Sequence, residues 1–228
     1  MKRKIILIFC AFVLINAGGA FCESSSPLLN EQSEKSPLTL DEIIDRVEER
    51  YNASGFFARF SQKSTLKAME ITDFASGSVL FKRPGMMRWE YEKPEIQEII
   101  TDGKTLWIFR REDNQVMIGK TASYFGDGKG GSFLSDIKLI RKKFRLSLEK
   151  KDNKNYVLKL LPMEKKLDLS AIYLSISKKT FDIIQIVTYN SYGDETIIEF
   201  GNVQFKENID DSKFKFEIPH NADILELD

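Results

Sequence analysis

The chain has 228 residues, and its 34 Lys and Arg balance 34 Asp and Glu, so no long-range basic field is present to recruit nucleic acid. Hydrophobic residues make up 42% and charged residues 30%, which is the composition of a globular protein with room for one sizeable domain. His220 is the only histidine, which argues against a metal site with several histidine ligands and against a catalytic mechanism with a histidine general base. We therefore expect no nucleic-acid partner, no metal and no cofactor.

The first 20 residues have the pattern of an export signal. Three basic residues at positions 2–4 precede an apolar run of eleven residues at 5–15, and small residues follow at 17–20. A helix needs about 20 apolar residues to cross the hydrocarbon core of a membrane, so the shorter run favours a cleavable signal over a permanent anchor. We predict a signal peptide over residues 1–20 and export to the periplasm.

Cysteine usage excludes a disulfide within the exported chain, because Cys10 lies in the predicted signal and Cys22 is then alone. Cys22 could be acylated as the first residue of a bacterial lipoprotein, but that processing prefers a small residue before the cysteine and Phe21 stands there. We favour a soluble periplasmic protein over this membrane-anchored alternative. The polar run over 21–38 cannot bury enough surface to offset its ordering entropy, and we predict a flexible linker there.

The first structured element is predicted to be an amphipathic helix. Thr39 and Glu42 have the spacing of a capping box, in which each side chain accepts a hydrogen bond from the backbone N–H of the other residue. Apolar residues recur at helical spacing: Leu40, Ile43, Ile44, Val47 and Tyr51. The helix should end near residues 52–55 and pack its apolar face on a sheet.

Short runs rich in β-forming residues, separated by turn residues, fill most of the remaining chain. The predicted strands cover residues 56–63, 77–83, 87–92, 96–101, 104–110, 115–118, 144–149, 156–161, 171–177, 183–189 and 195–205, with a short terminal piece at 213–218. Asp102 and Gly103 lie between two of these runs and indicate a tight hairpin, because its turn needs positive φ at both central residues. We expect consecutive strands to be antiparallel neighbours.

Two segments interrupt the strand pattern. The glycine-rich segment 126–131 lacks the lysine and hydroxyl ending of a phosphate-binding loop, so we interpret it as a flexible loop. Phe133, Leu134, Ile137 and Ile140 have helical spacing and predict a second short helix. The fold class is therefore mainly β: an incomplete, half-open antiparallel β-barrel of about eleven strands, with helices forming a lid, in a single domain over 39–228.

Alternating side chains give the predicted sheet one apolar face. Met87, Trp89 and Tyr91 share one side of their strand, and three charged residues occupy the other side. The same division recurs at 144–149 and 171–177. With few helices to fill it, this face could enclose a cavity or belong to a packed core, and periodicity does not separate the two.

Arg83 breaks the apolar pattern, because it shares the side of the strand that carries Val79 and Phe81. A guanidinium has five donors, so carbonyl groups of a covering helix or loop could satisfy it and latch a lid closed. The simpler alternative is an arginine at a strand end that reaches solvent. Spacing alone favours this simpler alternative.

The residues over 77–91, Pro94 and the run over 99–107 closely resemble the outer-membrane lipoprotein carrier family, LolA, and residues 56–62 (FFARFSQ) extend the resemblance. The resemblance implies a periplasmic chaperone that takes acylated lipoproteins from an inner-membrane ABC exporter and delivers them to an outer-membrane acceptor. It also implies an incomplete barrel of eleven antiparallel strands lidded by helices. We expect a monomer that is not an enzyme.

The resemblance also assigns roles to residues. Arg83 matches the arginine that holds the lid closed in this family, which reverses the preference for the simpler alternative. Trp89 matches the tryptophan of the family's cavity, whereas Met87 stands where many members have Phe. The expected lipid-binding cavity is lined by Val79, Phe81, Met87, Trp89 and Tyr91.

Two other function classes fit the sequence less well. Cys22 keeps open a membrane-anchored lipoprotein acceptor, or a lipid-sensing regulator, on a related half-barrel. A lipid hydrolase would need a nucleophile elbow of the Gly-x-Ser-x-Gly type, which the sequence lacks, and no Ser and Asp framework is recognisable around His220.

Overall fold

The structure, a computed structural model, describes residues 37–125, 133–151, 153–164 and 168–227. The predicted signal peptide, Cys22, nearly all of the predicted linker and the glycine-rich segment 126–131 lie outside these residues. The part of the chain that begins at Leu38 forms one compact unit. Within the described residues, no helix has both the length and the apolar character needed to cross a bilayer.

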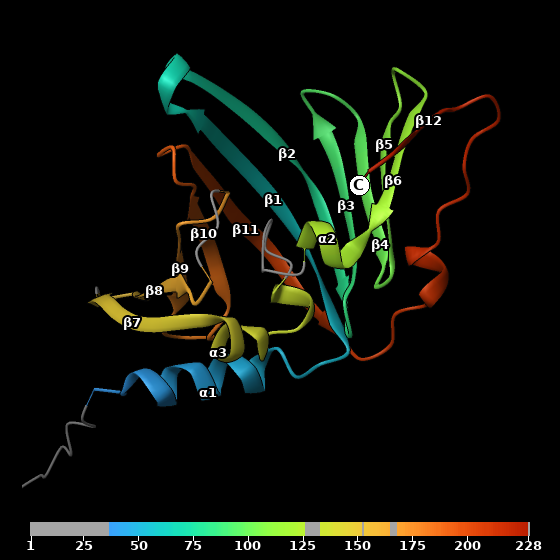
Figure 1. Ribbon diagram of the computed structural model, residues 1–228. Helices are drawn as coiled ribbons and strands as arrows, with labels where there is room; N and C mark the ends of the chain where they lie inside the picture. Colours follow the sequence, from blue (N-terminus) through green and yellow to red (C-terminus); the bar gives the residue numbers. More distant parts are fainter. Residues whose placement is uncertain (1–36, 126–132, 152, 165–167, 228) are drawn as a thin grey trace, which may run out of the picture. The chain divides into compact units, whose positions relative to one another are not determined.

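The described strands form one open sheet in the order β12-β6-β5-β4-β3-β2-β1-β11-β10-β9-β8-β7 (Figure 1). Their bounds are β1 Gly55–Leu66, β2 Ile71–Lys82, β3 Met86–Lys93, β4 Gln97–Asp102, β5 Thr105–Arg110, β6 Gln115–Lys120, β7 Phe144–Lys151, β8 Asn155–Pro162, β9 Ala171–Ser177, β10 Ile183–Tyr189, β11 Glu195–Lys206 and β12 Asp223–Glu226. All neighbours are antiparallel except β12, which runs parallel to β6. The predicted fold class, a mainly β sheet that does not close, is confirmed.

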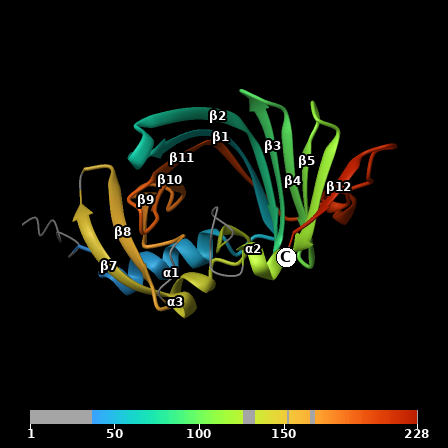
Figure 2. The ribbon, with the colours of Figure 1, turned by 45° about the horizontal axis from the view of Figure 1, so that its top comes forward.

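The first helix begins where the sequence predicts. In α1 (Leu40–Arg50), Thr39 Oγ1 accepts a hydrogen bond from Glu42 N at 3.3 Å. The Glu42 carboxylate accepts one from Thr39 N at 2.8 Å, which completes the capping box. The apolar stripe of α1 is buried against the sheet, which curls around the helix (Figure 2). We call the sheet face that carries Val79 and Trp89 the inner face, because α1 packs on it.

The second predicted helix is displaced towards the C-terminus. Residues 133–135 form a 3-10 turn, and α3 (Leu139–Lys143) begins six residues after Phe133. The apolar residues that suggested the helix are all buried, so the spacing identified a covering segment but not its conformation. A further short helix that the sequence did not predict, α2 (Thr121–Phe125), follows β6.

The hairpin of β1 and β2 is longer than predicted. Its pairing runs without a break from Gly55 opposite Lys82 to Leu66 opposite Ile71, and η1 (Lys67–Met69) closes it. The outer half of the hairpin is mostly polar or exposed, so it lacks the apolar alternation by which a strand is recognised.

The C-terminal prediction is wrong in detail. The expected strand at 213–218 does not form: its first two residues belong to η3 (Asp211–Phe214), and residues 215–218 are in neither a helix nor a strand. The first turn of η3 is capped because the Asp210 carboxylate accepts a hydrogen bond from Ser212 N at 2.8 Å. The chain then reaches β6 and adds β12, so the sheet has twelve strands rather than about eleven. Every residue of β12 is exposed, so tertiary pairing and not an apolar pattern creates this strand.

Candidate functional site

Cross-strand pairing arranges the inner face in rows, because residues paired across neighbouring strands project to the same side. The central row consists of Ala58, Val79, Trp89, Ile99, Ile108 and Met117, from β1 to β6. Its first three side chains are buried and its last three are half-buried. We call these six residues the apolar strip, and it leads from the core towards the β6 side of the sheet.

The two neighbouring rows differ in character. One row is buried from β1 to β5 and consists of Phe56, Phe81, Met87, Thr101 and Leu106. The other row passes from Phe60 and Tyr91 to Gln97 and Arg110. The apolar strip therefore lies between a fully buried row on one side and, on the other side, a row that becomes polar at Gln97 and Arg110.

Trp89 lies in the middle of an aromatic cluster and is only 3% exposed. Its ring centroid lies 4.9 Å from that of Phe60 and 5.8 Å from that of Phe81, in edge-to-face contacts. The rings of Tyr91 and Phe200 follow at 6.4 and 6.3 Å. The five predicted cavity residues thus lie together on one face, where they are packed against neighbouring side chains.

Tyr91 marks the polar border of this cluster. Its hydroxyl group donates a hydrogen bond to Gln62 Oε1 at 3.1 Å. Burial raises the pKa of Tyr91 to about 12, because the phenolate would be poorly solvated there. The protonated hydroxyl group thus remains a hydrogen-bond donor to Gln62 into the alkaline range.

The sequence did not single out the outer part of the apolar strip. Ile99, Ile108 and Met117 come from three different strands, and only the pairing of β3 to β6 places them in line with Trp89. Apolar and polar side chains alternate along these strands, and this pattern predicts which residues share a face of the strand. It does not predict the order of the strands in the sheet.

Arg83 follows the last residue of β2 and points to the loop after α1. Its Nε donates to the carbonyl oxygen of Ala53 at 3.1 Å, and Nη2 donates to the carbonyl oxygen of Asn52. The backbone N–H of Arg83 also donates to the carbonyl oxygen of Ser54 at 2.8 Å. The structure therefore places the predicted latch residue on backbone carbonyls of the segment that connects α1 to the sheet.

Within the part of the chain that the structure describes, no group of three or more His, Cys, Asp or Glu side chains is placed to hold a metal ion. The inner face offers mainly aliphatic and aromatic surface, and Thr101 is the polar residue of its buried row. Surface of this kind can hold an apolar ligand by burial.

These observations define the protein as a lidded half-barrel, an open β-sheet whose apolar inner face is covered by helices. The sequence profile of the family described as outer membrane lipoprotein carrier protein LolA matches residues 51–217. The chain belongs to this family, which confirms the resemblance seen in its motifs.

Individual relatives agree with the family assignment. An outer-membrane lipoprotein carrier protein from Neisseria meningitidis serogroup B is 27% identical over 183 residues, which is 80% of this chain and 86% of the relative. A protein of the same name from Cupriavidus pinatubonensis is 25% identical over 225 residues, or 99% of both chains. A solved structure of an uncharacterized conserved protein from Thermus thermophilus has a TM-score of 0.53 and 18% identity, covers 82% of this chain and 98% of its own, and supports the fold alone.

Proposed function

We propose that this protein is a periplasmic chaperone that shelters the acyl chains of lipoproteins on its inner face. In this proposal, a signal peptide at 1–20 directs export, residues 21–38 are a linker, and the domain over 39–228 acts as a monomer. It takes lipoproteins released by an inner-membrane ABC exporter and hands them to an outer-membrane acceptor. Family membership, the names of its relatives and the chemistry of the inner face support the proposal.

The physical need for such a carrier follows from the cost of exposing acyl chains to water. Each buried CH₂ group contributes about 0.8 kcal/mol, so one long chain is held in a membrane by on the order of 10 kcal/mol. A lipoprotein crosses an aqueous compartment only if a protein surface replaces the membrane. This transfer makes and breaks no covalent bond, so the proposal requires no catalytic group.

The observation that carries the proposal is the gradient of burial along the apolar strip. Val79 and Trp89 are buried, whereas Ile99, Ile108 and Met117 are half-buried. We propose that an acyl chain first contacts the half-buried end of the strip and then extends over the residues predicted to line the cavity: Val79, Phe81, Met87, Trp89 and Tyr91. Arg83 acts as the latch that restores the closed state after release.

Uptake of a triacylated lipopeptide from detergent micelles tests this function. Trp89→Glu should abolish uptake, because a carboxylate buried without a partner is costly. Ile108→Glu places the same charge on the half-buried part of the strip, where the fold should tolerate it, and should also strongly reduce uptake. Trp89→Phe and Ile108→Val are the matched apolar controls. Undiminished uptake by both glutamate variants would show that the inner face is not the binding site.

The chemical state of the mature N-terminus distinguishes the carrier from the alternative of a membrane-anchored acceptor. Mass spectrometry of the mature protein should show cleavage after residue 20 and an unmodified Cys22. An acyl group on Cys22 would instead identify an anchored protein.

A further inference from the structure

Helix α1 carries two charged flanks. Asp41, Asp45 and Glu48 are spaced four and three residues apart, which places three carboxylates in one stripe along the helix. Arg46 and Arg50 are four residues apart and form a second, basic stripe. The two stripes contact different parts of the molecule.

The basic flank is fixed to the sheet. Arg50 Nε donates to the Asp182 carboxylate at 2.7 Å, and its guanidinium carbon lies 4.1 Å from the centre of the Phe205 ring. Next to it, the Tyr51 hydroxyl oxygen accepts a hydrogen bond from the backbone N–H of Ile183 at 3.0 Å in a fully buried position. Separating α1 from this side would leave a buried N–H group without a partner, which is strongly unfavourable.

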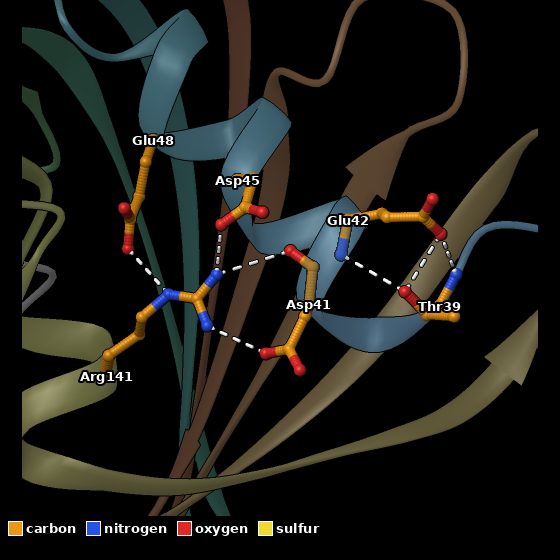
Figure 3. Close-up of polar contacts among 6 residues, drawn as sticks. All are labelled: Thr39, Asp41, Glu42, Asp45, Glu48 and Arg141. Atoms are coloured by element: carbon orange, nitrogen blue, oxygen red, sulfur yellow. Dashed lines mark hydrogen bonds and ion pairs between the residues drawn. The ribbon is translucent and has the colours of Figure 1, made fainter.

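The acidic flank is held by a single residue of α3. Arg141 donates to Asp41 at 2.8 Å, to Asp45 at 2.5 Å and to Glu48 at 3.0 Å, and also to the backbone carbonyl of Asp41 (Figure 3). The Arg141 side chain is 34% exposed, the side chains of Asp41 and Asp45 are 83% and 69% exposed, and that of Glu48 is 24% exposed. Ion pairs in such contact with water contribute little and are screened by salt.

The contrast between the two flanks identifies the weaker boundary. Behind the Arg141 contacts, Ile140 of α3 and Val47 of α1 belong to the same buried apolar cluster as Trp89. An opening here would lead to the inner face and would break the ion pairs of Arg141, of which those to Asp41 and Asp45 are largely exposed to water. A lid that a ligand must move needs a small free-energy difference between its closed and open states.

We propose that acyl chains reach the inner face by parting α3 from α1 at the Arg141 network, while α1 stays on the sheet. This inference rests on the proposed function for the identity of the ligand. The motion itself has a readout that needs no ligand. Arg141 is thus a second clasp, separate from the one at Arg83.

Hydrogen–deuterium exchange of full-length mature protein tests the motion. Arg141→Gln should raise amide exchange in residues 139–143 by about fivefold, the scale expected for loss of a small exposed network, and leave residues 43–51 unchanged. High salt should raise exchange in the wild type and have little further effect in the variant. The matched control is Arg59→Gln. It removes another exposed ion pair, in which Arg59 of β1 lies 2.6 Å from Glu92 of β3.

A complementary variant acts from the other side of the clasp. Replacing the three carboxylates together, D41N/D45N/E48Q, should reproduce the effect of Arg141→Gln, and combining both changes should add nothing further. The same proteins are then mixed with the triacylated lipopeptide in micelles. The variants that lack the clasp should load faster than the wild type, and Arg59→Gln should load at the wild-type rate.

The outcomes separate the two proposals. If α3 exchange and loading rates are the same in the wild type and both clasp variants, the opening at Arg141 is rejected while wild-type uptake still supports the carrier function. Faster exchange in α1 than in α3 would also reject it. If the wild type takes up no lipopeptide, the carrier function is rejected, and the proposed route loses its ligand.

Discussion

Gly77 of β2 lies so close to β3 that a Cβ atom on it would stand 1.9 Å from the carbonyl oxygen of Glu90. The Phe60 ring would also be only 3.0 Å away. The register between β2 and β3 shifts between Ser76 and Gly77, and Gly77 is paired with Tyr91, whose ring belongs to the aromatic cluster around Trp89. A glycine here allows the two strands to pack under that cluster.

Gly77→Ala should therefore destabilise the fold by about 2–3 kcal/mol, because backbone rather than a flexible side chain would have to move. Urea unfolding followed by tryptophan fluorescence measures the change. The control is Gly201→Ala in β11, where a Cβ atom meets nothing within 4 Å. That variant should be as stable as the wild type or slightly more so. Equal stability of the two variants would contradict the close-packing argument.

Tyr51→Phe should cost about 1–3 kcal/mol of unfolding free energy, since it leaves the buried N–H of Ile183 without its acceptor while the ring is retained. Thermal or urea unfolding measures it. Tyr192→Phe removes a hydroxyl from a side chain that is 68% exposed and should be neutral. If both variants unfold like the wild type, the contact does not fix α1 to β10.

Tyr91 should contribute to a fall in stability at alkaline pH, together with Tyr51 and Tyr189, whose pKa values are also raised. The pKa of Tyr91 is about 12 in the folded chain against 10.0 ordinarily, so above pH 10 the unfolded chain loses this proton first and unfolding is favoured as pH rises. Two pKa units correspond to about 3 kcal/mol, lost progressively between pH 10 and 12. Tyr91→Phe should reduce the steepness of this fall, whereas Tyr192→Phe should not. An unchanged slope in Tyr91→Phe would contradict the burial of the phenol.

How much the sequence predicts depends on the range of each interaction. The capping box at Thr39 and Glu42 is local, and the structure has it where it was expected. Alternation predicted the two faces of β3, but the pairing that aligns Ile108 with Trp89 depends on strand order. β12 is held by pairing with β6 and has no apolar pattern, so its position could not be read from its own residues.

Arg83 has one feature that the local sequence predicts and one that depends on contacts between distant segments. Its place on the side of Val79 and Phe81 was visible in the sequence, but its acceptors, the carbonyl groups of Asn52 and Ala53, come from a loop about thirty residues earlier. Backbone carbonyls carry no sequence signature, so the residues left this contact as one of two alternatives, and the family resemblance favoured it. Its role as a latch stays a prediction, and transfer measurements can test it.

Arg83→Leu should leave the fold intact, with a loss of about 1–2 kcal/mol for the guanidinium contacts, but it should slow release. Without the contacts to Asn52 and Ala53, the closed empty state loses its stabilisation relative to the open, loaded state, so ligand stays bound for longer. A loss of about 1.4 kcal/mol from the closed state shifts the balance towards the loaded state by about tenfold, which is measured as the fraction of bound lipoprotein retained when acceptor-containing liposomes are added. Arg59→Leu, on the far side of the sheet, removes a comparable charge and should transfer normally. Wild-type transfer by Arg83→Leu would reject the latch, while uptake by the same protein would still report on the inner face.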